Sequence, residues 1–428
     1  MAPLSLTHFV IVGAGAAGLM TARELARAGK KVTILEARDR CGGRIYPLPT
    51  QEFGYPAEGG AEFVHGAAAV TRALMREARL SLLPIEGTRW RAHKGVFSPN
   101  QSQLAHAALL HRALSELKTD LPVAEFLKTH FANQQYADLR DAIKRMVEGY
   151  DAADPDRAST FAFRDEWMAR GPRRDGRIAG GYGALIKFLL SECRGRGVTI
   201  RLFSVVTAIE ENRGRIAAYC DDGTIYEADA AILAVPLPIL RDISLPYSVR
   251  EKVTASTDIG YGNVVKILLR FSTKWWTNSG GRELSDLSFL FSNARVPVWW
   301  TQHPAEYPVL TGWLAGPKAD TVPRLTVSEL VKISLDSLAE IFNVPLHQIT
   351  KELITSQAIN WGTDSFARGA YSYATPKTRE AQTAFRKPDV GAIFFSGEAL
   401  YGGRDMGTVE AALANARQTA QAILAAGQ

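Results

Sequence analysis

The chain has 428 residues, which is long enough for two domains around one shared site. With 46% hydrophobic and 22% charged residues it has the composition of an ordinary globular protein, and no stretch offers the roughly 20 apolar residues of a membrane helix. The net charge of +6 comes from basic residues scattered along the chain, which favours a mildly basic surface over nucleic-acid binding. Three distant cysteines, Cys41, Cys193 and Cys220, predict no disulfide framework, and without a signal-peptide pattern they indicate a reducing, cytoplasmic compartment. We predict no metal site.

The first 36 residues have the pattern of a strand, a tight turn, a helix and a second strand. The wholly apolar run Phe9–Val12 is typical of a buried parallel strand. A helical stretch from about Ala17 to Ala28 follows, and a second strand covers residues 31–36. Between the first strand and the helix, residues 13–18 read GAGAAG and have GxGxxG spacing. This order of elements predicts a βαβ unit that binds a dinucleotide at the start of its helix.

Four residues of this unit have a physical reason to act at the dinucleotide site. Gly13 permits the tight turn, Gly15 lets the backbone approach a pyrophosphate, and Gly18 allows the helix to pack on the strand. The N–H groups at the helix start then face the phosphates, with the positive end of the helix dipole behind them. Glu36, which ends the second strand, is placed to accept hydrogen bonds from a ribose. These residues alone leave NAD and FAD open as the ligand.

The segment after Glu36 separates these two cofactors. Residues 37–47 read ARDRCGGRIYP, in which Gly42 and Gly43 leave the backbone bare and Arg44 is able to pair with a phosphate or lie against a ring system. Here the sequence resembles the flavin-containing amine oxidase family, which includes monoamine oxidases, polyamine oxidases and L-amino-acid oxidases. In that family the GGR segment wraps the FAD, and the resemblance extends over nearly the whole chain.

The resemblance implies an FAD site assembled from segments far apart in the sequence. AEGGAEFVHG, residues 57–66, is similar to the family's loop in front of the flavin, and is closest to polyamine oxidases in its final His-Gly. Residues 394–424 are similar to the C-terminal FAD motif, in which a helix begins near residues 406–409 and stabilises the negative charge of reduced flavin. The predicted cofactor residues are Gly13, Gly15, Ala17, Gly18, Glu36, Ala37, Arg38, Gly42, Gly43, Arg44, Gly60, Ala61, Glu62, Val206, Trp361, Gly397, Glu398, Met406, Thr408 and Val409.

Two polar residues are implied near the reacting end of the flavin. YGNVVKILLRF, residues 261–271, resembles the family's strand with a lysine beside the flavin, which makes Lys266 its counterpart, holding a water at flavin N5. From the local pattern alone, a strand-edge lysine that reaches water is the alternative. His65 is in the polyamine-oxidase-like position for proton transfer or substrate orientation, and a structural histidine is its alternative.

Aromatic residues are implied in the same place by residues 359–373. This stretch resembles the family's tryptophan loop, with Trp361 beside the flavin and Tyr371 on the substrate side of the ring. Monoamine oxidases carry a cysteine with covalent flavin at the position before that tyrosine, and this chain has Ala370. The resemblance therefore implies FAD bound without a covalent link.

The pattern departs from the family at the second aromatic ring that holds the substrate nitrogen. Tyr371 supplies one ring, but the position for the other, three residues before Gly407, is Arg404. An arginine facing the flavin repels a cationic amine and attracts a carboxylate, which favours an amino acid or another acid-bearing amine. Tyr401 is the alternative source of a second ring.

The predicted fold class is α/β, with a Rossmann-like FAD-binding domain interleaved with a substrate domain of mixed β-sheet and helices, as in the amine oxidase two-domain fold. Residues 1–75, 177–258 and 365–428 are assigned to the FAD-binding domain, and residues 76–176 and 259–364 to the substrate-binding domain. Residues 104–149 are mostly helix-forming. The active site is expected where the domains meet. Core packing is expected, with pocket lining as the alternative, for five tryptophans: Trp275, Trp276, Trp299, Trp300 and Trp313.

We predict an FAD-dependent amine oxidase. Hydride passes from the carbon that bears a neutral amine to flavin N5, the imine hydrolyses, and oxygen reoxidises the flavin to give hydrogen peroxide. The predicted partners are oxygen and a primary or secondary amine, polyamine or L-amino acid, without nucleic acid or membrane, and the sequence leaves monomer and homodimer open. The alternatives are a flavin dehydrogenase or desaturase acting on a non-amine substrate, a flavoprotein with a non-catalytic binding role, and an NAD(P) dehydrogenase, which the GGR and C-terminal GEA segments disfavour.

Overall fold

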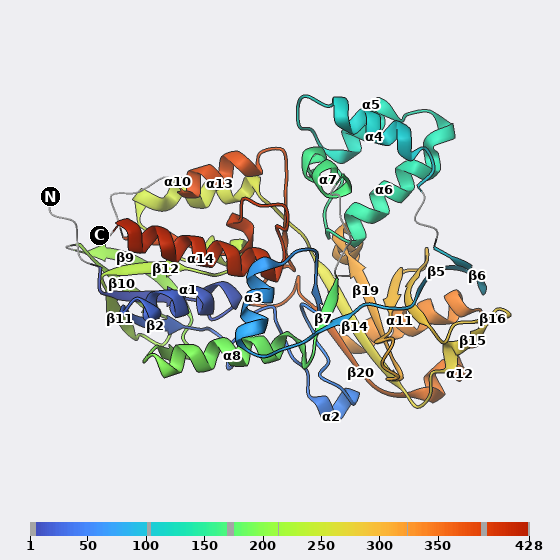
Figure 1. Ribbon diagram of the computed structural model, residues 1–428, viewed down its shortest axis with the longest axis horizontal. Coiled ribbons are helices and arrows are strands. Elements are labelled where there is room, and N and C mark those ends of the chain that lie inside the picture. Colours follow the sequence, from blue (N-terminus) through green and yellow to red (C-terminus); the bar gives the residue numbers. More distant parts are fainter. Residues whose placement is uncertain are drawn as a thin grey trace.

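The computed structural model describes residues 6–100, 104–168, 175–212, 214–322, 324–386 and 392–426. Two lobes lie side by side, one built on a parallel sheet between helices and the other on a larger mixed sheet with a helical cluster above it (Figure 1). Within these ranges no helix is long and apolar enough to cross a membrane, and no three His, Cys, Asp or Glu side chains are grouped to hold a metal ion.

The first lobe is built on a five-stranded sheet in which every pair of neighbours is parallel. Apart from the edge strand β8, its strands are mostly apolar, as expected where helices or a second sheet cover both faces. In spatial order they are β22 (Ile393–Phe395), β12 (Ala230–Leu233), β1 (His8–Val12), β2 (Lys31–Leu35) and β8 (Thr199–Arg201). The predicted opening βαβ unit is confirmed at its centre.

Alternate residues of β1 enter two different cores. Phe9 and Ile11 belong to the core with α1 (Ala16–Arg27), α8 (Gly181–Gly195) and α14 (Val409–Ala426). Val10 and Val12 belong to the other core, which contains a three-stranded antiparallel sheet and three helices. These elements are β9 (Val206–Asn212), β10 (Arg215–Cys220), β11 (Ile225–Ala228), α9 (Leu237–Leu240), α10 (Tyr247–Ala255) and α13 (Thr378–Arg386).

The second lobe contains a seven-stranded sheet, antiparallel except where β17 runs parallel to β5. In order its strands are β20 (Leu353–Asn360), β14 (Val264–Phe271), β19 (Val309–Ala315), β18 (Val298–Trp300), β17 (Leu287–Phe291), β5 (Thr88–His93) and β6 (Val96–Pro99). Two helices, α11 (Val327–Phe342) and α12 (Leu346–Glu352), pack against it. The five tryptophans divide between the two expectations, because Trp275, Trp276 and Trp299 pack in this core, whereas Trp300 and Trp313 line a cavity.

A separate apolar core joins the helices of the cluster above this sheet. They are α4 (Ala107–Glu116), α5 (Val123–His130), α6 (Ala137–Gly149) and α7 (Thr160–Trp167), which confirms the helical expectation for residues 104–149. The remaining elements are short: α2 (Thr50–Phe53), α3 (Ala69–Glu77), β3 (Phe63–Val64) and β4 (Leu82–Pro84) on β7 (Gly176–Ile178), β13 (Gly260–Tyr261) on β21 (Ser372–Tyr373), and β15 (Asn278–Ser279) on β16 (Arg282–Glu283).

The strands sort by lobe in the way the sequence suggests. Every strand of the parallel sheet lies in the stretches assigned to the FAD-binding domain, and every strand of the seven-stranded sheet lies in those of the substrate-binding domain. The small sheet β3-β7-β4 spans both assignments. The exact domain boundaries therefore stay a prediction.

Glu410, in the first turn of α14, joins this helix to α3. Its Oε1 accepts a hydrogen bond from the Val70 N–H (2.9 Å), and its Oε2 accepts from the N–H and hydroxyl of Thr71 (2.7 Å each). The carboxylate is buried and satisfies N–H groups that the first turn of α3 leaves without helical partners. Its contribution thus reaches beyond the dipole of its own helix.

We expect Glu410→Ala to lower the free energy of unfolding by about 2–4 kcal/mol, because it leaves three buried donors unpaired. Urea denaturation measures the change. Gln421→Ala, at an exposed position of the same helix, is the control and is expected to stay within about 0.5 kcal/mol of wild type. Equal stability of the two variants would contradict the linking role of Glu410.

Candidate active site

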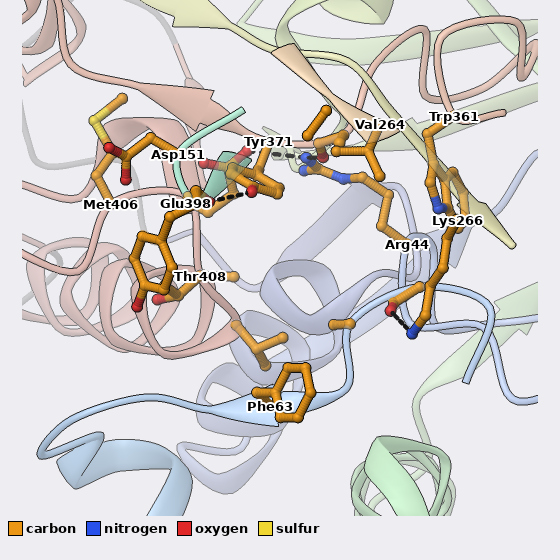
Figure 2. Close-up of a pocket in the computed structure, with 18 of the residues that line it drawn as sticks. Arg44, Phe63, Asp151, Val264, Lys266, Trp361, Tyr371, Glu398, Met406 and Thr408 are labelled. Atoms are coloured by element: carbon orange, nitrogen blue, oxygen red, sulfur yellow. Dashed lines mark hydrogen bonds and ion pairs between the residues drawn. The ribbon is translucent and has the colours of Figure 1, made fainter. Parts of the chain in front are cut away.

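A cavity of about 1250 Å³ lies between the two lobes and the helical cluster. Val12 and Leu35, at the carboxyl ends of β1 and β2, line one end of it, which is where ligands bind in parallel α/β sheets. Lys266 and Trp361 of the second lobe also line it, as does Tyr150, which follows α6. In Figure 2, Lys266, Arg44 and Trp361 are grouped on one side and Met406 and Thr408 on the other.

The turn after β1 has the backbone geometry of a phosphate cradle. Gly13 has a φ of 100°, which favours glycine there. A Cβ at Gly18 would lie 1.9 Å from the Gly13 carbonyl oxygen, so the helix can pack this close to the turn only because residue 18 is glycine. Gly15 is the N-cap residue of α1 and forms a bridge to Gly42, and a Cβ on Gly15 would meet no atom within 4 Å. The space in front of Gly15 is therefore open to the cavity.

Glu36 is fixed by the backbone around it. Its carboxylate accepts hydrogen bonds from the N–H groups of Ala14 (2.7 Å) and Arg38 (3.0 Å). Burial raises the pKa of Glu36, and the two backbone bonds oppose that rise. The Arg38 guanidinium in turn pairs with Asp364, so the residues after β2 are tied to the tryptophan loop.

Arg44 and Glu398 form an ion pair that joins the first and last parts of the chain. Arg44 Nη1 lies 3.1 Å from Glu398 Oε1 and also donates to the Ala370 carbonyl. Glu398 further accepts hydrogen bonds from the N–H and the hydroxyl of Ser372. Three segments that are distant in the sequence, around Arg44, residues 370–372 and Glu398, thus meet at this ion pair.

The loop in front of the cavity is pressed between Arg44 and Trp361. A Cβ at Gly60 would lie 1.8 Å from the Arg44 carbonyl oxygen and 3.2 Å from Trp361 Cζ2, so only glycine fits there. Trp361 Nε1 donates to the Gly59 carbonyl at 3.2 Å. The loop and the indole therefore hold each other in place.

Lys266 extends from the middle of β14 to the same loop. The side chain is 1% exposed, and Nζ donates to the Gly60 carbonyl (3.0 Å) and to Glu62 Oε2 (2.8 Å). Figure 2 draws a hydrogen bond of Lys266 as a dashed line. The ammonium is thus buried beside the Glu62 carboxylate, which offsets the cost of burying it. A strand-edge lysine that reaches water is excluded.

Tyr371 lies on the cavity wall beside two acidic residues. Its hydroxyl donates to the Tyr150 carbonyl at 2.5 Å. Burial raises the pKa of Tyr371 well above its ordinary value, and the charges of Asp151 and Glu166 raise it further. Both carboxylates also line the cavity, so the wall near Tyr371 is acidic. Asp151 lies near Tyr371 in Figure 2.

A family model described as flavin containing amine oxidoreductase matches residues 16–424. The chain belongs to this family. Polyamine oxidase 5 from Oryza sativa subsp. japonica is 27% identical over 424 residues, which are 91% of this chain and 82% of that protein. Lysine-specific histone demethylase 2 from Homo sapiens is 25% identical, over 91% of this chain and 50% of that protein. The expected flavin-dependent amine oxidase is confirmed at this level.

Solved structures show the same fold. Putrescine oxidase bound to putrescine superposes with a TM-score of 0.79 at 21% identity, covering 98% of this chain and 99% of that one. Cyclohexylamine oxidase from Brevibacterium oxydans has a TM-score of 0.76 at 19% identity, covering 98% of both chains. The predicted two-domain α/β amine oxidase fold is confirmed.

The cavity of this amine oxidase fits FAD. The open space at Gly15 suits a pyrophosphate, the Glu36 carboxylate beyond it suits a ribose, and Gly397 also has open space where a Cβ would project. Ala370 carries no nucleophile for a covalent link. The cofactor is FAD bound non-covalently.

The predicted cofactor residues line the cavity with one exception. Gly18 does not line it, because it packs against the carbonyl of Gly13 and so supports the turn without facing the cavity. The others are Gly13, Gly15, Ala17, Glu36, Ala37, Arg38, Gly42, Gly43, Arg44, Gly60, Ala61, Glu62, Val206, Trp361, Gly397, Glu398, Met406, Thr408 and Val409. Their individual roles toward FAD stay predictions.

Among the predicted catalytic residues, Arg404 needs correction. Lys266, Trp361, Tyr371 and His65 line the cavity, but Arg404 is exposed and is not among the lining residues that the structure describes. The bend before α14 turns this guanidinium to solvent, where its charge needs no buried partner. Tyr401, the alternative source of a second ring, does not line the described cavity either.

His65 is placed against aromatic rings and an acid. Its ring lies 5.9 Å from Phe63 and 5.5 Å from Tyr150 between centroids, and Nδ1 is 3.8 Å from Asp175 Oδ2. These contacts suit both an orienting and a structural histidine, so its role stays a prediction.

Sequence reasoning missed the residues that bind Glu62 and the two acidic residues of the cavity wall near Tyr371. Arg177, Trp300 and Gln302 donate to Glu62 from β7, β18 and the turn after β18. Asp151 and Glu166 lie in the helical region. No local motif marks any of them, because they meet only through the packing of distant elements.

Gly15→Val tests the phosphate cradle. The variant is expected to fold with a near-native melting temperature, because nothing lies within 4 Å of the added Cβ, but to fill the space of the pyrophosphate. The added side chain is expected to push the phosphate away from at least one backbone N–H. The loss of one such charge-assisted hydrogen bond, worth about 1.5–3 kcal/mol, lowers FAD affinity by about tenfold to a hundredfold. Gly195→Val, at another open glycine far from the cavity, is the control and should keep its FAD. Equal FAD affinity of both variants would contradict the assignment.

Glu58 gives stability a distinct pH dependence. Its Oε1 accepts from the Gly183 N–H (3.0 Å), while Oε2 has no hydrogen-bond partner among the described residues. Burial raises the pKa of Glu58 from 4.5 to about 7. Because the folded pKa is the higher one, folding favours the protonated form, and stability falls as the pH rises from about 4.5 to about 7.

Glu58→Gln is expected to remove this dependence. Between pH 5 and pH 8 the wild type should lose on the order of 3 kcal/mol more stability than the variant. Urea denaturation of the holoenzyme across this pH range measures it. Parallel stability curves would show that Glu58 is not the titrating group.

Proposed function

We propose that the protein oxidises a small-molecule amine and passes the electrons to oxygen, giving an imine that hydrolyses and hydrogen peroxide. One observation carries the proposal: the FAD cradle and the side chains of Lys266, Trp361 and Tyr371 line one continuous cavity. FAD, when bound, supplies the acceptor for the hydride of the carbon that bears the nitrogen. The protein's own part is to bind and orient the amine and to exclude competing water.

Each of these side chains supports a specific part of that task. An ammonium carries three N–H donors, and Lys266 uses two on Gly60 and Glu62, which leaves one for a water or substrate in the cavity. Tyr371 does not exchange protons near neutral pH, because its pKa is raised far above 10 and its hydroxyl is bonded to the Tyr150 carbonyl. Its ring therefore orients the amine.

The charges along the cavity favour one class of amine. Asp151 and Glu166 attract an ammonium toward Tyr371. The part of the cavity lined by β5 and α6 carries Arg89, Arg91 and Arg145, and burial together with Arg145 lowers the pKa of Arg91. Asp138 offsets only part of this positive charge. We therefore infer a substrate with one cationic nitrogen and a neutral or anionic far end, such as an arylalkylamine or amino acid, over a long polycation.

Anaerobic mixing tests this proposal. Purified holoenzyme is mixed with arylalkylamines, L-amino acids and polyamines while the flavin absorption is followed. Bleaching by a monoamine or amino acid, and weaker bleaching by polyamines, is expected. Bleaching by polyamines alone would overturn the inferred class, and an unbleached flavin with every amine would favour a dehydrogenase acting on a non-amine substrate or a non-catalytic flavoprotein.

Asp151→Asn is expected to raise KM for a cationic amine about tenfold, equivalent to about 1.4 kcal/mol, with a smaller effect on kcat, because it removes an attracting charge. Steady-state kinetics measures the split. Asp156→Asn makes the same charge change at an exposed position outside the cavity lining and should leave KM within about twofold. A KM for Asp151→Asn equal to that of the control would remove Asp151 from substrate binding.

A cytoplasmic location is likewise proposed from the sequence. Cys41, Cys193 and Cys220 are free thiols, as a reducing compartment requires of them.

A further inference from the structure

Glu62 accepts hydrogen bonds from four side chains of the second lobe and the small sheet. Lys266 Nζ donates to Oε2, while Arg177 Nε (2.8 Å) and Gln302 Nε2 (3.0 Å) donate to Oε1. Trp300 Nε1 lies 3.1 and 3.2 Å from the two oxygens. A carboxylate has about four lone-pair sites, so these donors occupy it fully. The carboxylate of Glu62 therefore lines the cavity with both oxygens already bonded to protein donors, and the predicted contact of this residue with FAD stays a prediction.

The charge of Glu62 is secured by its two cationic partners. Although burial raises its pKa, Lys266 and Arg177 lower it to about 2. The side chain is 8% exposed, and that of Arg177 is 13% exposed. One buried anion thus compensates two nearby cations, and the group keeps one net positive charge beside the cavity.

The partners of Glu62 are themselves held in place. Arg177 Nη2 donates to the Thr301 carbonyl (2.9 Å), and its guanidinium lies 4.6 Å from the centre of the Phe63 ring. Lys266 Nζ lies 5.4 Å from the centre of the Trp300 ring, at the distance of a cation–π contact. The anchoring comes from β7 and β18, whereas Lys266 comes from β14. Glu62 is where the three elements are joined.

We propose that Glu62 is the positioning residue of Lys266: anchored by Arg177, Trp300 and Gln302, it fixes Nζ in the cavity wall and sets the net positive charge that the bound flavin meets. The inference deepens the proposed function, because Lys266 is the polar group assigned to the reacting end of the site. An uncharged residue at this position would leave two cations buried without an anion, which is strongly unfavourable. A shorter acid would keep the charge but would not reach both cations.

Two variants of the holoenzyme separate the effect of Glu62 on the position of Lys266 from the effect of its negative charge. Glu62→Asp keeps the charge and shortens the reach, and Glu62→Gln keeps the length and removes the charge. We measure the midpoint potential of the bound flavin and, after chemical reduction, its rate of reoxidation by oxygen. Neither measurement needs an amine, so failure of this inference and failure of the proposed substrate class are distinguishable.

The two variants are expected to differ in a defined way. Glu62→Asp should leave the midpoint potential near that of wild type and slow reoxidation by on the order of tenfold, because the ammonium is no longer fixed. Glu62→Gln should slow reoxidation to a similar extent and also raise the potential, because an added net positive charge stabilises reduced flavin. Reoxidation of Glu62→Asp at the wild-type rate would overturn the positioning role, and an unchanged potential in Glu62→Gln would overturn the charge role.

A double-mutant cycle shows whether Glu62 acts through Lys266. Lys266→Met is expected to slow reoxidation severely, and adding Glu62→Gln should then change the rate by less than about twofold. If Glu62→Gln slowed reoxidation in the Lys266→Met enzyme by the same factor as in the wild-type enzyme, the two residues would act independently, which would contradict the positioning role. Asp156→Asn, which removes one carboxylate charge at an exposed position outside the cavity lining, is the control and should reoxidise at the wild-type rate.

Discussion

The ion pair of Arg44 and Glu398 is the interaction on which the cavity depends. Arg44 follows the opening βαβ unit, Glu398 follows the last strand of the parallel sheet, and the same two side chains reach the Ala370 carbonyl and Ser372. Removing Arg44 would leave the nearly buried carboxylate of Glu398 without its compensating charge, which is destabilising. The pair thus joins a segment near the start of the chain to one near its end in the wall of the site.

A second set of buried charges completes the site from the other lobe. The Arg177–Glu62–Lys266 group ties the loop in front of the cavity to the seven-stranded sheet, as Arg44 and Glu398 tie it to the parallel sheet. Between the two groups lie glycines whose side-chain positions are open or already occupied by neighbouring backbone, at Gly15 and Gly60. The two groups of buried charges hold the cavity walls in place, and the absence of side chains at these glycines leaves room for FAD.

The sequence predicts most accurately the elements whose formation depends on residues close together along the chain. The opening strand, turn and helix are confirmed because their apolar pattern and glycine spacing are local, and the C-terminal helix begins at Val409, within the predicted region. The resemblance also brings Lys266, Trp361 and Tyr371 to one cavity. Arg404 departs from expectation because a family position does not fix the direction of a short loop. The partners of Glu62 could not be predicted, because they meet it only through the packing of β7, β18 and the residues after β18 around the loop that carries Glu62.

The hydrogen bond from Tyr371 to the Tyr150 carbonyl has a mechanical consequence. Tyr150 is the residue after α6, so the aromatic wall of the substrate site is attached to the end of a helix in the cluster above the sheet. The position of this helix end and the orientation of the ring are therefore coupled, so that fixing one restrains the other.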